Sequence, residues 1–160
     1  MKTATPDGRL FDIPGSPPFR IRHLVLDLNG TLSDHGTLID GVAARLESLA
    51  DGLELHLVTA DTLGTARTLA AGLPVTVDTI ARGEDKATLV HRLGAGLTAA
   101  IGNGRNDGPM LRAAALGIAV IGPEGAAASA LMAADVVCRS ILEALDLLLD
   151  EQTLVSTLRD

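Results

Sequence analysis

The sequence is poor in the residues that build several common kinds of site. Its single cysteine, Cys138, excludes an internal disulfide framework and a cysteine-rich zinc site. Tryptophan and tyrosine are absent, and Phe11 and Phe19 are the only phenylalanines, so platforms on which nucleic-acid bases stack are missing. The net charge of −7 also repels nucleic-acid phosphates. We therefore expect no nucleic-acid partner.

Long apolar segments are lacking too. The longest uninterrupted apolar runs, such as residues 130–134, are far shorter than the ~20 residues needed to cross a bilayer. Residues 1–18 contain no apolar core of the kind found in secretion signals. We therefore expect no membrane partner and a cytoplasmic location. The composition, 47% hydrophobic and 21% charged over 160 residues, is typical of one soluble folded domain.

Short apolar segments alternate with segments whose apolar residues recur at helical spacing. Strands are predicted at 21–28, 53–59, 75–80, 97–101, 118–121 and 136–138. Helices are predicted at 40–50, 61–71, 86–93, 106–116, 125–133 and 141–149. This alternation predicts an α/β fold in which a mainly parallel sheet lies between two layers of helices. We assign residues 1–20 to an arm or small hairpin, 21–150 to the core and 151–160 to a tail.

Polar side chains follow three of the predicted strands. They lie in the segments Asp27-Leu28-Asn29-Gly30-Thr31, Thr59-Ala60-Asp61 and Gly102-Asn103-Gly104-Arg105-Asn106-Asp107. In parallel sheets, ligands bind beyond the carboxyl ends of the strands. The sequence therefore predicts a site where these three segments meet.

Three residues of this set suit the transfer of a phosphoryl group. Asp27, at a strand end, can act as a nucleophile or as a metal ligand. Thr59 can donate its hydroxyl to a phosphate oxygen, although a threonine in such a segment is more often a helix N-cap. Lys86 is one of only two lysines beside eleven arginines, which indicates a position that needs a compact point charge, although most helical lysines are solvated surface residues.

Other residues of the set suit a hard metal ion and a phosphate. Asn29 can offer a carbonyl oxygen, and Asn103 and Asp107 offer the oxygen ligands that Mg²⁺ prefers. Backbone amides around Gly30 can donate to a phosphate.

The four histidines show no pair at metal-ligand spacing. We expect His56, in a strand, and His91, in a helix, to be structural. His35 is the one histidine that we expect near the site.

The order and spacing of these segments resemble the four motifs of the haloacid dehalogenase (HAD) superfamily over nearly the whole chain. The segments GNGRND and ALGIAVIG resemble the soluble, P-type-ATPase-like proteins of that superfamily. The resemblance implies a Rossmann-like three-layer α/β/α sandwich, a Mg²⁺ cofactor and an aspartyl-phosphate intermediate. It implies catalytic roles for Asp27, Asn29, Thr59 and Lys86, phosphate binding at Gly30, Thr59, Ala60 and Lys86, and metal binding at Asp27, Asn29, Asn103 and Asp107.

Two departures from the usual phosphatase pattern predict a slow enzyme. Asn29 stands where typical members carry an acid–base aspartate, and an amide does not exchange a proton near neutral pH. Asn103 replaces the first acid of the last motif, which removes one negative charge from the metal site. The alternative to a slow enzyme is a phosphatase whose substrate has a leaving group that needs little protonation, such as an acyl or aryl phosphate. Asp61 and His35 are the candidate substitutes for the proton carrier.

The gaps at 31–58 and 60–85 each hold one core helix and strand, so we expect no cap domain. A site without a cap can be covered by a neighbouring subunit, so a homo-oligomer is plausible. We predict a Mg²⁺-dependent phosphohydrolase that acts on a small phosphorylated substrate through Asp27. The alternatives are a non-catalytic binding module for a phosphometabolite or a protein, and an ATP hydrolase, which the missing GxxxxGK[ST] loop disfavours.

Overall fold

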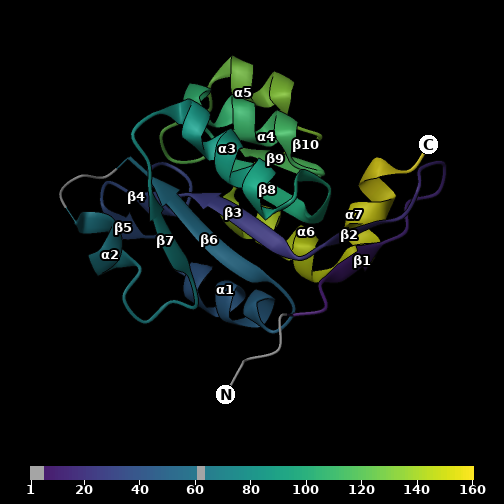
Figure 1. Ribbon diagram of the computed structural model, residues 1–160, viewed down its shortest axis with the longest axis horizontal. Coiled ribbons are helices and arrows are strands. Elements are labelled where there is room, and N and C mark those ends of the chain that lie inside the picture. The colour runs from purple at the N-terminus through teal and green to yellow at the C-terminus, as the bar shows by residue number, and fades with distance from the viewer. Residues whose placement is uncertain (1–5, 61–63) are drawn as a thin grey trace.

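A six-stranded parallel sheet forms the centre of the protein, described here from a computed structural model over residues 6–60 and 64–160 (Figure 1). The strand order is β10-β9-β8-β3-β6-β7. The strands are β3 (His23–Asp27), β6 (Glu54–Thr59), β7 (Thr76–Thr79), β8 (Thr98–Gly102), β9 (Leu116–Val120) and β10 (Val136–Cys138). Each neighbouring pair is parallel, so all carboxyl ends lie at one edge of the sheet.

Helices cover both faces of this sheet, which makes the three-layer α/β/α sandwich that the alternating pattern predicts. One face packs against α3 (Gly83–Leu93), α4 (Gly108–Ala113) and α5 (Ala128–Ala133), which lie together in Figure 1. The apolar cluster on the other face includes buried residues of α1 (Val42–Ala50), α2 (Thr65–Leu69), α6 (Ile141–Leu149) and α7 (Glu151–Leu158). The central strands are buried on both faces because helices cover each side.

Sheet pairing sets several boundaries that local pattern does not. The segment 21–28 divides into β2 (Phe19–Ile21) and β3, because β2 pairs antiparallel with β1 (Arg9–Phe11) rather than joining the main sheet. The helix predicted at 106–116 is too long. It forms the 3₁₀ turn η2 (Arg105–Asp107) and α4, which ends at Ala113, because Leu116 already pairs with β8.

Both ends of the chain carry structure outside the main sheet. The pair β1–β2 places Phe11 in the core, stacked on Phe19 with ring centroids 5.5 Å apart. The residues expected to form a tail are instead largely helical, and α7 buries Leu154. Two shorter elements complete the fold: the hairpin β4 (Ser33–Asp34) with β5 (Thr37–Leu38), and the 3₁₀ turn η1 (Ala95–Leu97).

The strand order reverses direction between β3 and β8. From β3 the chain adds β6 and then β7 on one side, and then returns to add β8, β9 and β10 on the other. Loops leaving the carboxyl ends of β3 and β8 therefore turn to opposite faces and leave a crevice between them. Over the described residues, no helix is long and apolar enough to span a bilayer.

Candidate active site

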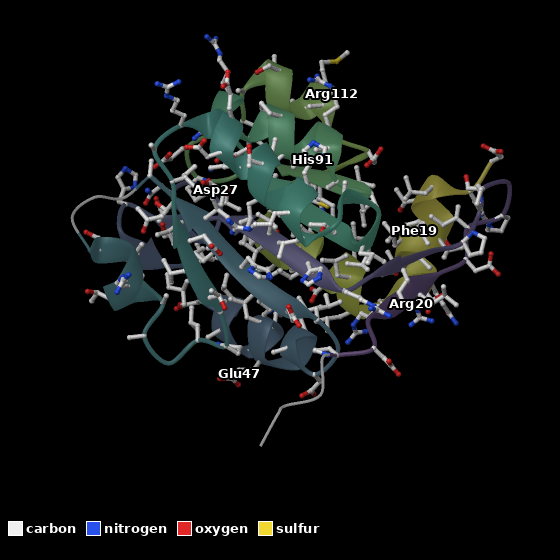
Figure 2. All side chains as sticks on the ribbon, viewed as in Figure 1. Phe19, Arg20, Asp27, Glu47, His91 and Arg112 are labelled. Atoms are coloured by element: carbon white, nitrogen blue, oxygen red, sulfur yellow. The ribbon has the colours of Figure 1, made fainter. Side chains whose placement is uncertain are left out.

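Three residues from separate parts of the chain meet at this crevice. Asp27 is the last residue of β3 and is labelled in Figure 2. Lys86 lies in the first turns of α3, and its Nζ is 2.7 Å from Asp27 Oδ1 and 2.6 Å from Asp107 Oδ1. Lys86 is 1% exposed, Asp107 is fully buried and Asp27 is 7% exposed, so one largely buried ammonium joins two carboxylates.

Neighbouring donors hold the other oxygens of the two carboxylates. The Thr31 hydroxyl lies 3.0 Å from Asp27 Oδ2 and 3.2 Å from Asn103 Oδ1, so its single proton can serve one of them at a time. Asp107 Oδ2 accepts hydrogen bonds from the backbone amides of Asn103, at 3.0 Å, and Gly104, at 2.8 Å. These contacts fix both carboxylates before any ligand binds.

The pKa values of Asp27 and Lys86 are both raised, but for different reasons. Burial, followed by the nearby charge of Asp107, raises the pKa of Asp27 to about 6, against the opposing effect of Lys86 and Thr31. Burial acts to lower the pKa of Lys86, but the two carboxylates outweigh it and raise that pKa above its ordinary value. Lys86 therefore stays charged, while Asp27 is a carboxylate that gains from added positive charge.

These groups border a cavity of about 370 Å³. It is lined by Asp27, Asn29, Thr59, Ala60, Lys86, Asn103, Gly104, Asn106 and Glu124. Six of the residues expected at the site thus line one cavity. Of the remaining two, Asp107 contacts Lys86, and Gly30 has a φ of +76° at a place where a Cβ atom would come within 2.8 Å of Asn103 Nδ2.

Three polar residues at the site were not assigned a role from the sequence, namely Thr31, Glu124 and Asn106, which also lines the cavity. Thr31 is fully buried beside Asp27, in the turn that follows β3. Glu124 lines the cavity from the loop after β9, and a Cβ on Gly30 would lie 2.6 Å from its Oε2. Ligand-binding residues follow the carboxyl ends of parallel strands, and the same rule applied to β9 would have identified Glu124.

Of the two candidate substitutes for the proton carrier, His35 is described by the structure and lies away from the cavity. His35 lies in the turn between β4 and β5 with its side chain 85% exposed, contacts Asp34 and does not line the cavity. Its φ of 47° is the left-handed conformation expected of a tight turn. Asp61 lies outside the described residues.

The donor set fits a hard divalent cation. Asp27, Asn103 and Asp107 present carboxylate and amide oxygens around one crevice, and Mg²⁺ prefers oxygen ligands. Asp27 and Asp107 both contact a single ammonium, and their mutual repulsion contributes to the raised pKa of Asp27. A further positive charge therefore has a clear electrostatic reason to bind here.

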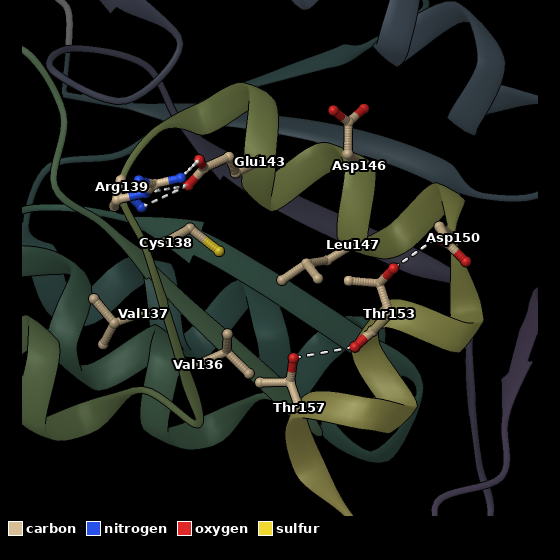
Figure 3. A pocket seen from close by; sticks show the side chains of 10 residues that line it. All are labelled: Val136, Val137, Cys138, Arg139, Glu143, Asp146, Leu147, Asp150, Thr153 and Thr157. Atoms are coloured by element: carbon tan, nitrogen blue, oxygen red, sulfur yellow. Dashed lines mark hydrogen bonds and ion pairs between the residues drawn. The ribbon is translucent and has the colours of Figure 1, made fainter.

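A different cavity, of about 550 Å³, lies between β10 and the helices α6 and α7 (Figure 3). It contains none of the expected site residues. Its cysteine, Cys138, has a pKa raised by burial and by nearby Glu143 to about 11, so the thiol stays protonated at neutral pH. Arg139 and Glu143 at its rim satisfy each other, at 2.6 Å. This cavity offers no activated nucleophile.

Comparison with known sequences finds a relative for part of the chain. No protein-family model matches the chain. An uncharacterized protein of Methanocaldococcus jannaschii is 52% identical over 61 residues, which cover 38% of this chain and 66% of that protein. The match thus spans slightly less than two thirds of the relative's length.

Solved structures match over most of the chain. The 3-deoxy-D-manno-octulosonate 8-phosphate phosphatase of Moraxella catarrhalis, in complex with magnesium, phosphate and its KDO ligand, has a TM-score of 0.70 at 19% identity and covers 85% of this chain and 90% of its own. A protein of Legionella pneumophila, described as a HAD superfamily hydrolase of subfamily III A, has a TM-score of 0.66 at 22% identity, covering 86% and 87%.

A zinc-transporting P-type ATPase has a TM-score of 0.64 at 28% identity, covering 75% of this chain but 20% of the pump. These likenesses agree with the parallel sheet, its strand order and the absence of a folded cap within residues 6–60 and 64–160. The chain therefore has the fold of the haloacid dehalogenase superfamily, in its capless form.

Proposed function

We propose that this protein is a Mg²⁺-dependent phosphohydrolase that forms an aspartyl phosphate at Asp27. The observation that carries the proposal is the buried contact of Asp27 with Lys86, which also holds Asp107, beside a cavity at the switch point of the sheet. A nucleophile, a fixed cation and oxygen ligands for a metal are the parts that phosphoryl transfer needs.

In the first step an oxygen of Asp27 forms a bond to the phosphorus of the substrate. The bond from phosphorus to the substrate oxygen breaks, and its electron pair leaves with that oxygen. Lys86 is charged and lies 2.7 Å from the attacking carboxylate, so it offsets repulsion between this carboxylate and the phosphate. Thr59, buried at the end of β6 and lining the cavity, is positioned to donate to a phosphate oxygen.

In the second step water attacks the phosphorus of the aspartyl phosphate. The bond from phosphorus to Asp27 breaks, inorganic phosphate leaves and the carboxylate is restored. Asn29 lines the cavity but neither gives a proton to the leaving group nor takes one from water. General acid–base catalysis is typically worth about 10²–10⁴-fold, so this enzyme is slow with substrates that leave as alkoxides.

The residues suited to hold the metal are Asp27, Asn103 and Asp107, together with Asn29. A bound Mg²⁺ supplies charge stabilisation of the transferring phosphoryl group. Asp107 is held in place by two backbone amides, and Asn103 by a hydrogen bond from its Nδ2 to the Gly125 carbonyl, at 3.1 Å. The ligands are thus oriented by the fold itself.

The substrate class in this proposal is a small acyl or aryl phosphate. A cavity of about 370 Å³ suits a small molecule, and the leaving groups of such phosphates need little protonation. In this proposal the protein is cytoplasmic and binds neither nucleic acid nor membranes. A homo-oligomer is compatible with the proposal.

One observation favours a second candidate, an ATP hydrolase. The zinc-transporting ATPase is the match of highest identity among the structures compared above, at 28%, although the chain covers 20% of that protein. A binding module without catalysis is the third outcome that an assay has to separate.

The test is turnover of acetyl phosphate, p-nitrophenyl phosphate and ATP, with and without Mg²⁺, beside Asp27→Asn. Mg²⁺-dependent release of phosphate from the first two, lost in the variant, supports the proposal. Release from ATP alone supports the second candidate. Absence of turnover with a broad panel of phosphate esters rejects both enzymes and leaves the binding module.

A further inference from the structure

A second cluster of ligand-type side chains lies at the opposite end of the strands that carry the candidate active site. His23 is the first residue of β3 and pairs in register with Glu54, the first residue of β6. His56 follows Glu54 by two positions, so it points to the same face of the sheet. His23 and Asp27 are four positions apart on β3, a distance of about 13 Å at ~3.3 Å per residue. The two clusters are therefore separate sites.

The ligand atoms of this cluster are close enough to share an ion. One nitrogen of each histidine and one oxygen of Glu54 all lie within 4.8 Å of one another. The His23 Nδ1 to Glu54 Oε2 distance is 3.2 Å, and the two imidazole rings have centroids 5.6 Å apart. Ligands at ~2.1 Å from a tetrahedral ion are roughly 3.4 Å from each other, so small side-chain rotations suffice.

The two imidazoles also present nitrogen atoms that the protein leaves without a hydrogen bond. His23 Nδ1 and His56 Nε2 are buried, and neither has a hydrogen-bond partner among the described residues. His23 Nδ1 is near Glu54 but not in line for a hydrogen bond. His56 is 9% exposed, and a buried polar atom without a hydrogen-bond partner destabilises the folded protein. A ligand that enters from the solvent side would satisfy these atoms.

A carboxylate lies near the other nitrogen of the His56 ring. His56 Nδ1 is 3.6 Å from Asp78 Oδ2 on the neighbouring strand β7, which is beyond hydrogen-bond distance and leaves Nε2 available for a metal. Histidines that ligate a metal commonly donate from their other nitrogen to a carboxylate, and a small rotation of either side chain would complete this contact. Arg92, 3.6 Å from the other oxygen of Asp78, holds that carboxylate on its far side.

We propose that His23, Glu54 and His56 form a site for a divalent transition metal of the Zn²⁺ type. Two imidazole nitrogens and one carboxylate oxygen suit Zn²⁺, Co²⁺ or Ni²⁺, whereas Mg²⁺ prefers ligands that are all oxygens. The Glu54 side chain is 38% exposed, and Glu54 and His56 border a cavity of about 740 Å³, so an ion has a path from solvent. Water then completes the coordination.

The metal would act as a clamp between the amino ends of two central strands. On binding, the unpartnered nitrogen of each imidazole would coordinate the metal. β3 and β6 would then be joined by coordination bonds in addition to their backbone hydrogen bonds. Binding to the folded state alone raises the stability with ion concentration. The site neither contains nor touches the residues proposed for catalysis.

The test measures Zn²⁺ and Co²⁺ binding to the full-length Asp27→Asn protein by calorimetry and by the visible absorption of Co²⁺. This background weakens binding at the candidate active site without touching the cluster. We expect one Zn²⁺ per chain, a Co²⁺ band of low-coordinate geometry and a rise in Tm with Zn²⁺. Added His23→Gln or His56→Gln is expected to weaken binding at least tenfold, and the matched control His91→Gln, on the exposed side of α3, to leave it unchanged.

Glu54→Gln serves where a buried histidine variant does not fold, because Glu54 is partly exposed, and it is expected to weaken binding as well. Zn²⁺ binding that is lost in Asp27→Asn alone, or that survives all three cluster substitutions, overturns the proposal. So does the absence of any heat of Zn²⁺ binding and of any Zn²⁺-dependent rise in Tm. None of these results depends on phosphatase activity, so the proposal stands or fails separately from the proposed function.

Discussion

The two ends of β3 and β6 treat buried polar groups in opposite ways. At the carboxyl end, Asp27 and Asp107 share the ammonium of Lys86, and their remaining oxygens accept hydrogen bonds from Thr31 and from backbone amides. At the amino end, buried imidazole nitrogens of His23 and His56 have no hydrogen-bond partner within residues 6–60 and 64–160. The carboxyl end is therefore organised by the chain itself, whereas the amino end, in the proposal above, is completed by a bound ion. Preorganised charge suits catalysis, while a set of unsatisfied ligands suits binding.

The largest effect is expected when the nucleophile is removed from the carboxyl end of β3. We expect Asp27→Asn to lower kcat for acetyl phosphate by at least about 10³-fold, because an amide does not attack phosphorus. The measurement is phosphate release at saturating substrate and Mg²⁺. Asp34→Asn, in the exposed β4–β5 hairpin, is the control and is expected to keep full activity. Comparable activity in both variants would place the chemistry elsewhere.

The next change keeps the charge of the organised end but alters its shape. We expect Lys86→Arg to lower kcat by about 10²-fold, because a planar guanidinium does not fit between carboxylates that both lie within 2.7 Å of a compact ammonium. Arg82→Lys, on an exposed residue at the start of α3, provides the matched control. Unchanged kcat in Lys86→Arg would show that positive charge alone is sufficient.

A third change adds to the organised end the group that it lacks. We expect Asn29→Asp to raise kcat for an alkyl phosphate by about 10–10²-fold, since a carboxyl at this exposed position lining the cavity can protonate the leaving oxygen. Acetyl phosphate, whose leaving group needs little protonation, should change much less. The ratio of the two rates is the measurement, and an equal effect on both substrates contradicts the acid–base interpretation.

The smallest effect concerns the stability of the organised end without metal. The pKa of Asp27 is raised from 3.8 to about 6, so between these pH values the folded state binds more protons than the unfolded state. This group's contribution to stability is therefore greatest below pH 4 and is lost as pH rises to 6. Asp27→Asn mimics the protonated form.

In EDTA, we expect the Tm difference between Asp27→Asn and the wild type to grow from near zero at pH 4 to several degrees at pH 7. Each kcal/mol shifts Tm by roughly 2–4 °C in a protein of this size. Thermal melts across this range are the measurement. A difference that does not change with pH would mean that Asp27 is not a strained carboxylate.

The sequence predicts the organised end well because its signals are local. Each candidate residue directly follows a strand or starts a helix, and the rule that strand ends converge places Asp27 near Asn103 without knowledge of the register. The scarcity of lysine singled out Lys86, which is buried at the centre of the site. Roles in catalysis remain predictions, as do the assignments of metal and phosphate ligands.

The amino end could not be predicted in the same way. His23 and His56 are separated by 33 positions, and their meeting depends on the register in which His23 pairs with Glu54. A shift of one residue would send His56 to the other face of the sheet. The end of α4 could not be predicted from the sequence either, because it is set by the pairing of Leu116 with β8 and not by the local sequence pattern.

The ammonium of Lys86 affects how the folded protein responds when Mg²⁺ is scarce. A lysine is tethered by covalent bonds, so dilution or a chelator cannot carry it away, and the core keeps a resident counterion between Asp27 and Asp107. Removal of Mg²⁺ would then lower turnover without unfolding the protein, and activity would return when Mg²⁺ is added again. For an enzyme of the proposed kind, the rate of phosphate release would rise and fall reversibly with the concentration of free Mg²⁺.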